Sequence, residues 1–183
     1  MFRIVPYLNK ILTILFCRFY AFLFLYLDNN STNMGTSTFK INLFLFFKLP
    51  AAFWCGVRLQ SINSQDCTTT VKHRWFNQNP FHSMYFAVQA MAAELATGAL
   101  VMHRIHQSGR SISMLVASNK CVFTKKATGR IHFICADGER LETAIHETIT
   151  TGEGKTVWLR SIGTNEKGEV VSEMDFEWTL KVK

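Results

Sequence analysis

The 183-residue sequence lacks the motifs by which several common enzyme classes are recognised. It contains no Walker or dinucleotide-binding glycine pattern, no serine nucleophile elbow and no HExxH zinc motif. Its five cysteines are an odd set without a CxxC pair, so neither a zinc knuckle nor a disulfide framework is expected. We expect buried free thiols in a reducing compartment, and no bound metal or cofactor.

Clusters of basic residues are also missing. The formal net charge is +7. Of the 20 lysines and arginines, only Arg3, Lys10 and Arg18 lie in the first 33 residues, and the others are spread along the rest of the chain. This distribution argues against nucleic-acid binding, which usually shows a basic patch, and suits an anionic small molecule better. With 48% hydrophobic and 18% charged residues, the chain is expected to fold around one core.

The first 33 residues raise a separate question. Residues 11–27 are apolar except for Thr13 and Arg18, and this run is at the lower limit for spanning a bilayer. One interpretation of residues 1–33 is a weak signal anchor. Its positively charged flank would keep the N-terminus in the cytoplasm and place the domain on the other side of the membrane. The other, which we favour, is a misassigned start, with translation beginning at Met34. A start at Met34 predicts a cytoplasmic protein. Contact with a membrane is expected only if residues 1–33 are part of the translated protein.

Residues 34–59 are predicted to form an apolar helix and a linker ahead of the main domain, residues 60–183. Pro50 should end the helix near Leu49, because proline breaks a helix. The apolar faces of this helix are expected to cover one end of a sheet. A helix that lies on a membrane surface is the alternative.

A long helix is predicted over residues 84–106. Large apolar residues recur there at spacings of three and four: Met84, Val88, Met91, Leu95, Met102 and Ile105. The opposite side is also apolar but small, with residues such as Ala90 and Gly98, so a sheet could approach the backbone closely. A helix that is hydrophobic all round is typically buried.

The rest of the domain shows the two-residue period of β-strands. A short helix is expected over residues 139–150. Strands are expected over residues 66–75, 111–124, 130–136 and 155–163, and from Val170 to Val182, the clearest of them. One strand, a long buried helix and four further strands predict an α+β domain in which a curved antiparallel sheet wraps around the central helix.

These elements resemble the hotdog superfamily over about residues 55–183. The resemblance is carried by Asn79-Pro80-Phe81, by a small-residue helix with one acid, and by the Glu166–Glu169 turn before an alternating last strand. The chain is most similar to an uncharacterised group, a domain of unknown function, related to PaaI-type and YiiD-type thioesterases. PaaI-type enzymes open the helix with His-Gly-Gly and place an acid nine residues after the histidine. Here Glu94 keeps the acid position, while Tyr85–Ala87 replace His-Gly-Gly.

The resemblance implies that Glu94 is a general base that activates water toward a thioester carbonyl. It is the only acid between residues 84 and 102. Burial in an apolar helix would raise its pKa, which suits a base that works near neutral pH. The alternative is a structural carboxylate, paired with a basic residue or capping backbone amides. Gln89 could be its partner if the geometry brings the two together.

Further candidates lie around the start of this helix. The backbone N–H groups of Tyr85 and Phe86 are expected to point toward a developing oxyanion. Asn77 and Asn79 are candidates for positioning the thioester or the water, with ordinary turn hydrogen bonding as the alternative. His82 is expected to be a surface-loop histidine.

Coenzyme A would also need cations for its phosphates. Lys125, Lys126 and Arg130 are the preferred candidates, and Lys72 and Arg74 are further ones, with solvated strand residues as the alternative. His103 and His106 have the spacing of two metal ligands, but no third ligand is evident and a charged helix end explains them better.

The resemblance therefore implies a homodimeric or tetrameric hydrolase. Its substrate would be an acyl-coenzyme A thioester, bound at a site between subunits as in the family, with no cofactor apart from the coenzyme A of the substrate. The alternative is a non-catalytic acyl-coenzyme A or lipid-binding protein of the same fold, since His-Gly-Gly is absent.

Overall fold

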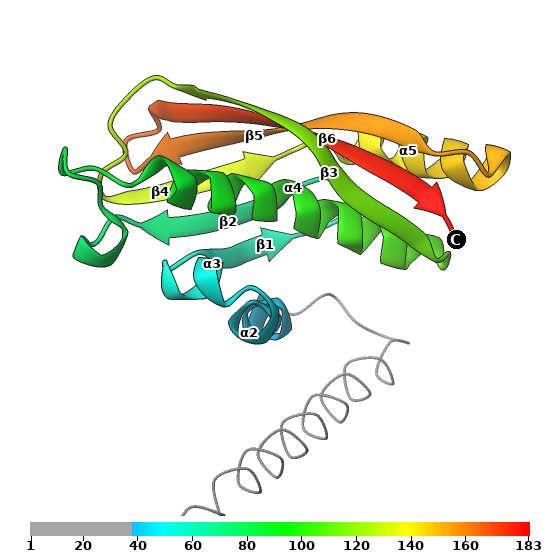
Figure 1. Cartoon of the computed structure of the whole chain (residues 1–183), viewed down its shortest axis with the longest axis horizontal. Helices are drawn as coiled ribbons and strands as arrows, with labels where there is room; N and C mark the ends of the chain where they lie inside the picture. Colours follow the sequence, from blue (N-terminus) through cyan, green and yellow to red (C-terminus); the bar gives the residue numbers. More distant parts are fainter. Residues whose placement is uncertain (1–37) are drawn as a thin grey trace, which may run out of the picture. The chain divides into compact units, whose positions relative to one another are not determined.

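The apolar stretch at the centre of the sequence forms helix α4, Phe86–Ser108, in the computed structural model, which describes residues 38–183. A curved sheet wraps around this helix (Figure 1). Ala92, Ala93, Ala96 and Leu100 are fully buried, as the prediction of a buried helix requires. By length and composition α4 could cross a membrane, but most of it lies inside the core of this domain.

The sheet has six antiparallel strands in the order β1-β2-β4-β5-β6-β3. The strands are β1 (Arg58–Ile62), β2 (Cys67–Lys72), β3 (Ile112–Phe123), β4 (Arg130–Cys135), β5 (Lys155–Asn165) and β6 (Val170–Val182). The other helices are α2 (Thr38–Lys48), α3 (Pro50–Trp54) and α5 (Gly138–Thr151), with a 3-10 turn, η1 (Trp75–Asn77). This is the hotdog fold, and the predicted sheet around a central helix is confirmed.

The alternating last strand is β6, with the predicted boundaries. Its inward side chains from Ser172 onward are buried: Ser172, Met174, Phe176, Trp178 and Leu180. The acids between them are partly exposed on the other face of the sheet. One face of the sheet therefore packs on α4 and the other faces solvent.

Strand β1 was not predicted from the sequence, because of its five residues only Leu59 is buried and no alternation is visible. It lies at an edge of the sheet, where unpaired backbone groups need a partner. Asn42 of α2 supplies one. Its Oδ1 accepts from the Leu59 N–H at 2.9 Å, and its Nδ2 donates to the Leu59 carbonyl at 3.0 Å.

Helices α2 and α3 belong to the same compact unit as the sheet, which spans Thr38–Lys183. Helix α2 ends at Lys48, and Pro50 begins α3, so the helix ends where the proline predicted. Residues 1–37 lie outside the described residues, and with them the predictions about residues 11–27 and Met34.

Candidate functional site

Glu94 lies in the middle of α4, close to the edge of the Trp178 indole from β6. Its Oε1 is 3.4 Å from the point that a Cβ on Gly98 would occupy, and two ring atoms of Trp178 are 3.1 Å from that point. Within residues 38–183, the Glu94 carboxylate makes no hydrogen bond and no ion pair. Burial raises the pKa of Glu94 above its ordinary value.

The surroundings of this carboxylate are rigid. Gly98 has no side chain, which makes room for the Trp178 ring against the helix. The indole Nε1 donates to Thr97 Oγ1 at 3.1 Å, and the Thr97 hydroxyl donates to the Glu94 carbonyl at 3.0 Å. These two hydrogen bonds hold the indole beside Glu94.

Gln89 is not a partner of Glu94. The two residues are five apart, which places them about 140° from each other around a helix of 3.6 residues per turn. The Gln89 Oε1 accepts from Ser172 Oγ at 3.1 Å, and its Nε2 donates to the Met84 carbonyl at 3.4 Å. Gln89 thus bridges α4 and β6, which is a structural role.

The free amides at the start of α4 are one residue later than predicted. The Tyr85 N–H donates to the Asn77 carbonyl at 2.9 Å, so it is not available to an oxyanion. The Phe86 and Ala87 N–H groups have no acceptor within the part of the chain that the structure describes. They begin the helix, where backbone amides and the helix dipole favour an anion. The candidate oxyanion donors are therefore Phe86 and Ala87.

Asn77 and Asn79 hold the loop before α4. The buried Asn77 side chain donates to the Cys55 and Lys72 carbonyls, both at 2.9 Å, and accepts from the Arg74 N–H at 2.8 Å. Asn79 Oδ1 accepts from the Phe81 and Ser83 amides at 2.9 and 3.2 Å. These are the turn hydrogen bonds left open as the alternative, and they indicate positioning of the helix start rather than contact with a substrate.

The predicted phosphate-binding cations differ in their surroundings. Lys125 Nζ is paired with Glu169 at 2.6 Å, and Lys126 Nζ donates to the Phe81 carbonyl at 3.3 Å. Arg130 is the register partner of Lys72, so two like charges lie on neighbouring strands. Like charges directly opposite each other are unfavourable, and a bound anion would relieve the repulsion.

The histidines do not form a metal site. His82 lies exposed in the loop, with a φ of 57°. His103 is hydrogen-bonded to Gln107 at 3.1 Å on the exposed end of α4. Among residues 38–183, no three His, Cys, Asp or Glu side chains are grouped as metal ligands.

The four cysteines after residue 37 show no activated thiol. Cys67 and Cys135 are register partners on β2 and β4, and both are fully buried. Burial raises the pKa of both thiols, so neither is ionised at neutral pH. The prediction of buried free thiols is confirmed for this pair, whereas Cys55 and Cys121 are partly exposed.

One edge of the sheet next to the helix start is apolar and unpaired. Within residues 38–183, strand β3 pairs only with β6. Leu115, Val122 and Phe123 on this strand are 69%, 60% and 44% exposed, and Phe86 at the helix start is 55% exposed. The Phe86 and Phe123 rings are 6.3 Å apart between centroids. This apolar edge is continuous with the free amides of α4.

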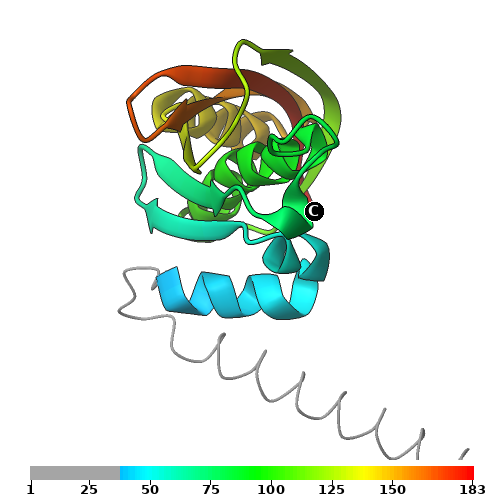
Figure 2. The same cartoon turned by 90° about the vertical axis from the view of Figure 1, so that its left-hand side faces the viewer.

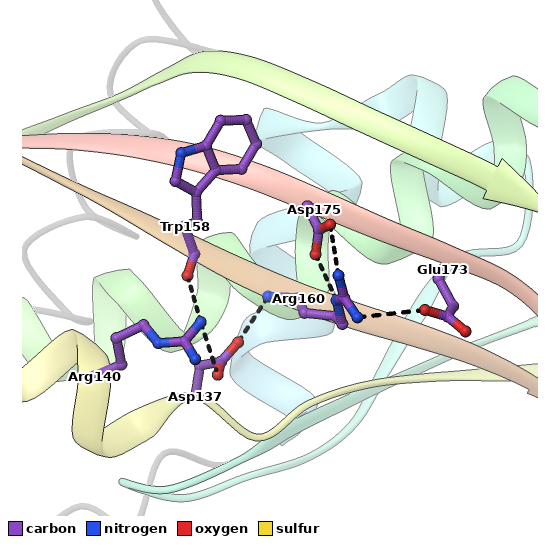
Figure 3. A network of polar contacts seen from close by, with 6 residues as sticks. All are labelled: Asp137, Arg140, Trp158, Arg160, Glu173 and Asp175. Atoms are coloured by element: carbon purple, nitrogen blue, oxygen red, sulfur yellow. Dashed lines mark hydrogen bonds and ion pairs between the residues drawn. The ribbon is translucent and has the colours of Figure 1, made fainter.

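The outer face of the sheet carries a network of polar side chains, which was not predicted from the sequence (Figure 3). Arg160 on β5 binds Asp175 on β6 through two bonds, Nε to Oδ1 at 2.7 Å and Nη2 to Oδ2 at 2.9 Å. The Arg160 backbone N–H donates to Asp137 Oδ2 at 2.7 Å, and Arg140 Nη1 donates to the Trp158 carbonyl at 3.1 Å. These residues line an open hollow of about 430 Å³.

This outer network needs no ligand, because each of its carboxylates already has a cationic or amide partner. Arg160 and Asp175 are register partners, so the pairing follows from the strand alignment. The outward positions of two facing strands could have suggested it, but their register was not predictable. We assign it to the stability of the sheet.

Solved structures of other proteins share the fold of this chain. A thioesterase from Haemophilus influenzae is similar, with 8% identity, a TM-score of 0.63, and coverage of 81% of this chain and 93% of that chain. A protein of unknown function from Pseudomonas aeruginosa, described as a probable thioesterase, shares 24% identity with a TM-score of 0.66, covering 79% and 95%. A protein of unknown function from Chlorobaculum tepidum shares 16% identity with a TM-score of 0.69, covering 80% and 94%.

The protein thus shares the hotdog fold with these structures. Residues 38–180 match the family model described as a domain of unknown function, DUF4442. The chain belongs to this family. No curated protein matches it.

Proposed function

We propose that the protein hydrolyses an acyl-coenzyme A-type thioester, with Glu94 as the general base. One observation carries the proposal: Glu94 is a partly buried carboxylate beside the Trp178 ring, without a partner in the described domain. Leaving a carboxylate unpaired in a partly apolar site opposes folding, because the charged form loses hydration that no partner replaces. Perturbed acids of this kind cluster at functional sites, where a raised pKa makes a better base.

The reaction needs three groups. Glu94 takes a proton from water while the water oxygen attacks the thioester carbonyl carbon. The carbonyl oxygen becomes an oxyanion, which accepts hydrogen bonds from the Phe86 and Ala87 amides. The carbon–sulfur bond then breaks, the thiolate leaves and receives the proton, and the products are a carboxylic acid and a free thiol.

The spacing of the proposed groups along α4 favours a site shared by two copies of the chain. Phe86 and Glu94 are eight residues apart, so they are separated by about 12 Å along the axis of α4 at a rise of 1.5 Å per residue. A carbonyl held by the amides of one chain is too far from a water activated by the Glu94 of the same chain. We propose a homodimer, paired along the apolar edge of β3, in which Glu94 of one chain works with the amides of the other.

Cations at the ends of the strands complete the substrate site. The opposed Lys72 and Arg130 would bind the phosphates of coenzyme A, because an anion relieves their mutual repulsion. Lys125 and Lys126 are weaker candidates, since Lys125 is neutralised by Glu169. Such a substrate is met in the cytoplasm, and we place the domain there.

The first experiment is hydrolysis of a panel of acyl-coenzyme A esters by the purified protein, Glu94→Ala and Glu139→Gln. Glu139 is an exposed acid on α5, so its variant controls for a change in net charge. We expect turnover by the wild type and by Glu139→Gln, and a loss of about 100-fold or more in Glu94→Ala. Equal rates of hydrolysis by the wild type and by Glu94→Ala would contradict the proposed mechanism.

The second experiment tests the amides. Proline is tolerated at the first position of a helix, and Tyr85 has the extended backbone, φ −60° and ψ 136°, that precedes proline readily. Phe86→Pro therefore removes one N–H without breaking α4. Phe86→Ala, which keeps the N–H and loses the same ring, is the matched control. We expect kcat of Phe86→Pro to be about 100-fold lower than kcat of Phe86→Ala.

Mixed dimers test whether the site is shared. When Glu94→Ala and Phe86→Pro chains are co-expressed with different tags and the mixed dimer is isolated, one of its two sites has both native groups. We expect about half of the wild-type activity in this dimer if the groups come from different chains. No recovery of activity over either parent would contradict the shared site.

A non-catalytic binding protein is the second candidate, because Tyr85–Ala87 replace the His-Gly-Gly that the related enzymes use. Bulky side chains at this position narrow the approach to the amides. Thermal stabilisation by acyl-coenzyme A together with an unchanged thioester after long incubation would favour this candidate.

A further inference from the structure

A group of exposed apolar side chains covers the outer side of α2 and α3. Phe39, Phe46, Leu49 and Trp54, which we call the α2–α3 patch, are 72%, 38%, 40% and 66% exposed. Phe39 and Phe46 are seven residues apart and share one helix face. The Phe46 and Trp54 rings are 6.3 Å apart between centroids, so the patch is continuous from one helix to the next.

The patch is not needed for the fold. The other face of α2 does the packing, with Leu45 fully buried and Asn42 bound to the edge of β1. Figure 2 shows α2 as the outermost helix of the described domain, beyond β1 and β2. The patch therefore faces away from the core, and the proposed catalytic groups on α4 do not involve it.

Neighbouring aromatic residues extend the same surface. Trp75 and Phe76 in η1 are 82% and 65% exposed. Asn77, the next residue, donates to the carbonyl of Cys55 at 2.9 Å, which fixes this turn beside the end of α3. A soluble monomer rarely exposes so many large aromatic side chains in one area, which indicates an interaction surface.

The charge around the patch indicates its partner. Between residues 38 and 65 the sequence has three basic residues, Lys40, Lys48 and Arg58, and no acid. Tryptophan and phenylalanine beside basic residues are typical of segments that lie in the boundary between lipid headgroups and acyl chains. Basic residues near that boundary favour anionic lipids.

We propose that the α2–α3 patch docks the protein onto the surface of an anionic lipid bilayer, with the Trp54 indole inserted at the headgroup boundary. A second copy of the chain fits the patch less well. A twofold contact through this surface would bring the basic residues of both copies together without any acid of the segment to compensate them. The inference does not depend on the proposed hydrolysis.

Tryptophan fluorescence tests the position of the patch directly. All four tryptophans, at positions 54, 75, 158 and 178, lie after residue 37, so the fluorescence is emitted by the described domain alone. The full chain is mixed with vesicles of phosphatidylcholine and phosphatidylglycerol that carry brominated acyl chains, which quench nearby indoles. Trp54→Phe keeps an apolar ring but removes the reporter, and Trp158→Phe, on the outer face of the sheet, is the matched control.

We expect clear quenching in the wild type and in Trp158→Phe, and a loss of at least half of the quenched fraction in Trp54→Phe. Equal quenching in both variants, or none in the wild type, would overturn the proposal. No quenching in the wild type, together with self-association that is lost in the Phe39→Ser and Phe46→Ser double variant, would identify a second copy as the occupant of the patch.

Vesicle flotation measures the strength of the contact. Phe39→Ser together with Phe46→Ser should weaken partition into phosphatidylglycerol-containing vesicles by about ten-fold, because two aromatic rings no longer leave water. Ile134→Ser together with Ile162→Ser, a pair of neighbouring isoleucines 41% and 37% exposed on another face, should leave partition unchanged. Equal partition of both double variants, or no dependence on phosphatidylglycerol, would contradict the proposal.

Discussion

Two carboxylates on opposite sides of the same sheet show how differently this protein uses an acid. Asp175 lies on the outer face, where two hydrogen bonds from Arg160 lower the pKa of its carboxyl group. Glu94 lies on the inner side beside the Trp178 ring, where burial raises the pKa of its carboxyl group and no partner compensates. Asp175 is thus arranged to remain charged, and Glu94 to exchange a proton.

The difference separates stability from function. A paired acid on the surface contributes a little to the stability of the fold. Its oxygens already accept hydrogen bonds, so they are not free to take a proton from water. An unpaired acid in an apolar site opposes folding, and such a cost is typical of residues that serve another purpose. Four predictions test this contrast.

The largest expected effect is on catalysis. Glu94→Gln should lower kcat/KM for a thioester substrate by about 100-fold to 10,000-fold, because the amide cannot accept the proton from water. Asp175→Asn should leave it within about two-fold, since the outer network takes no part in the reaction. Steady-state kinetics of the two purified variants measures this. A similar loss of kcat/KM in both variants would contradict a specific catalytic role of Glu94.

The next effect concerns the packing that shapes the inner site. Gly98→Ala places a Cβ 3.1 Å from the Trp178 ring, which its bond to Thr97 holds in place. We expect a net destabilisation of about 1 kcal/mol, since an overpacking cost of about 2 exceeds the helix propensity gained with alanine. Urea unfolding measures this.

The double variant is the control for this packing effect. Trp178→Phe removes the two indole atoms that the new Cβ would meet, so Gly98→Ala should be neutral or stabilising in that background. If the cost of Gly98→Ala is unchanged by Trp178→Phe, the indole is not its cause.

A smaller effect concerns the pH dependence of stability. Since burial raises the pKa of Glu94, its ionisation opposes folding as the pH rises above the ordinary carboxyl range, and the penalty is complete above the raised pKa. Glu94→Gln should therefore be more stable than the wild type at neutral pH by about 1 kcal/mol. The gain should disappear in acid, where Glu94 is protonated. Melting temperatures of both proteins across pH check this, and a less stable variant at neutral pH would show that the charge has a partner.

The smallest effect is that of Asp175→Asn on stability. The hydrogen bonds from Arg160 lower the pKa of Asp175, so the stabilisation is present above the ordinary carboxyl pKa and is lost as the pH falls through the lowered value. The pair is largely exposed, so we expect a loss of only about 0.5 kcal/mol at neutral pH. Urea unfolding in low and high salt measures it. A loss several times larger would give the outer network more than a surface role.

Local patterns in the sequence predicted much of the fold. The alternation from Val170 to Val182 is strand β6 with the same boundaries, and the apolar stretch over residues 84–106 is α4, two residues later at each end. Strand β1 was missed, because an edge strand held by the Asn42 side chain needs no apolar alternation of its own. The Tyr85 amide was assigned wrongly, because its acceptor, the Asn77 carbonyl, depends on how the loop closes.

Most of the elements, the buried helix and the single acid on it could be predicted from the sequence alone, because helical and strand periods and a lone charge in an apolar run are local properties. Only the tertiary structure decided which polar groups are occupied. Asn77 is bound to Cys55, Gln89 to Ser172 and Arg160 to Asp175, and each pair is joined by strand register or loop closure across the chain. Glu94 is left without such a partner, and it is distinguished from the other acids by the packing around it rather than by its position in the sequence.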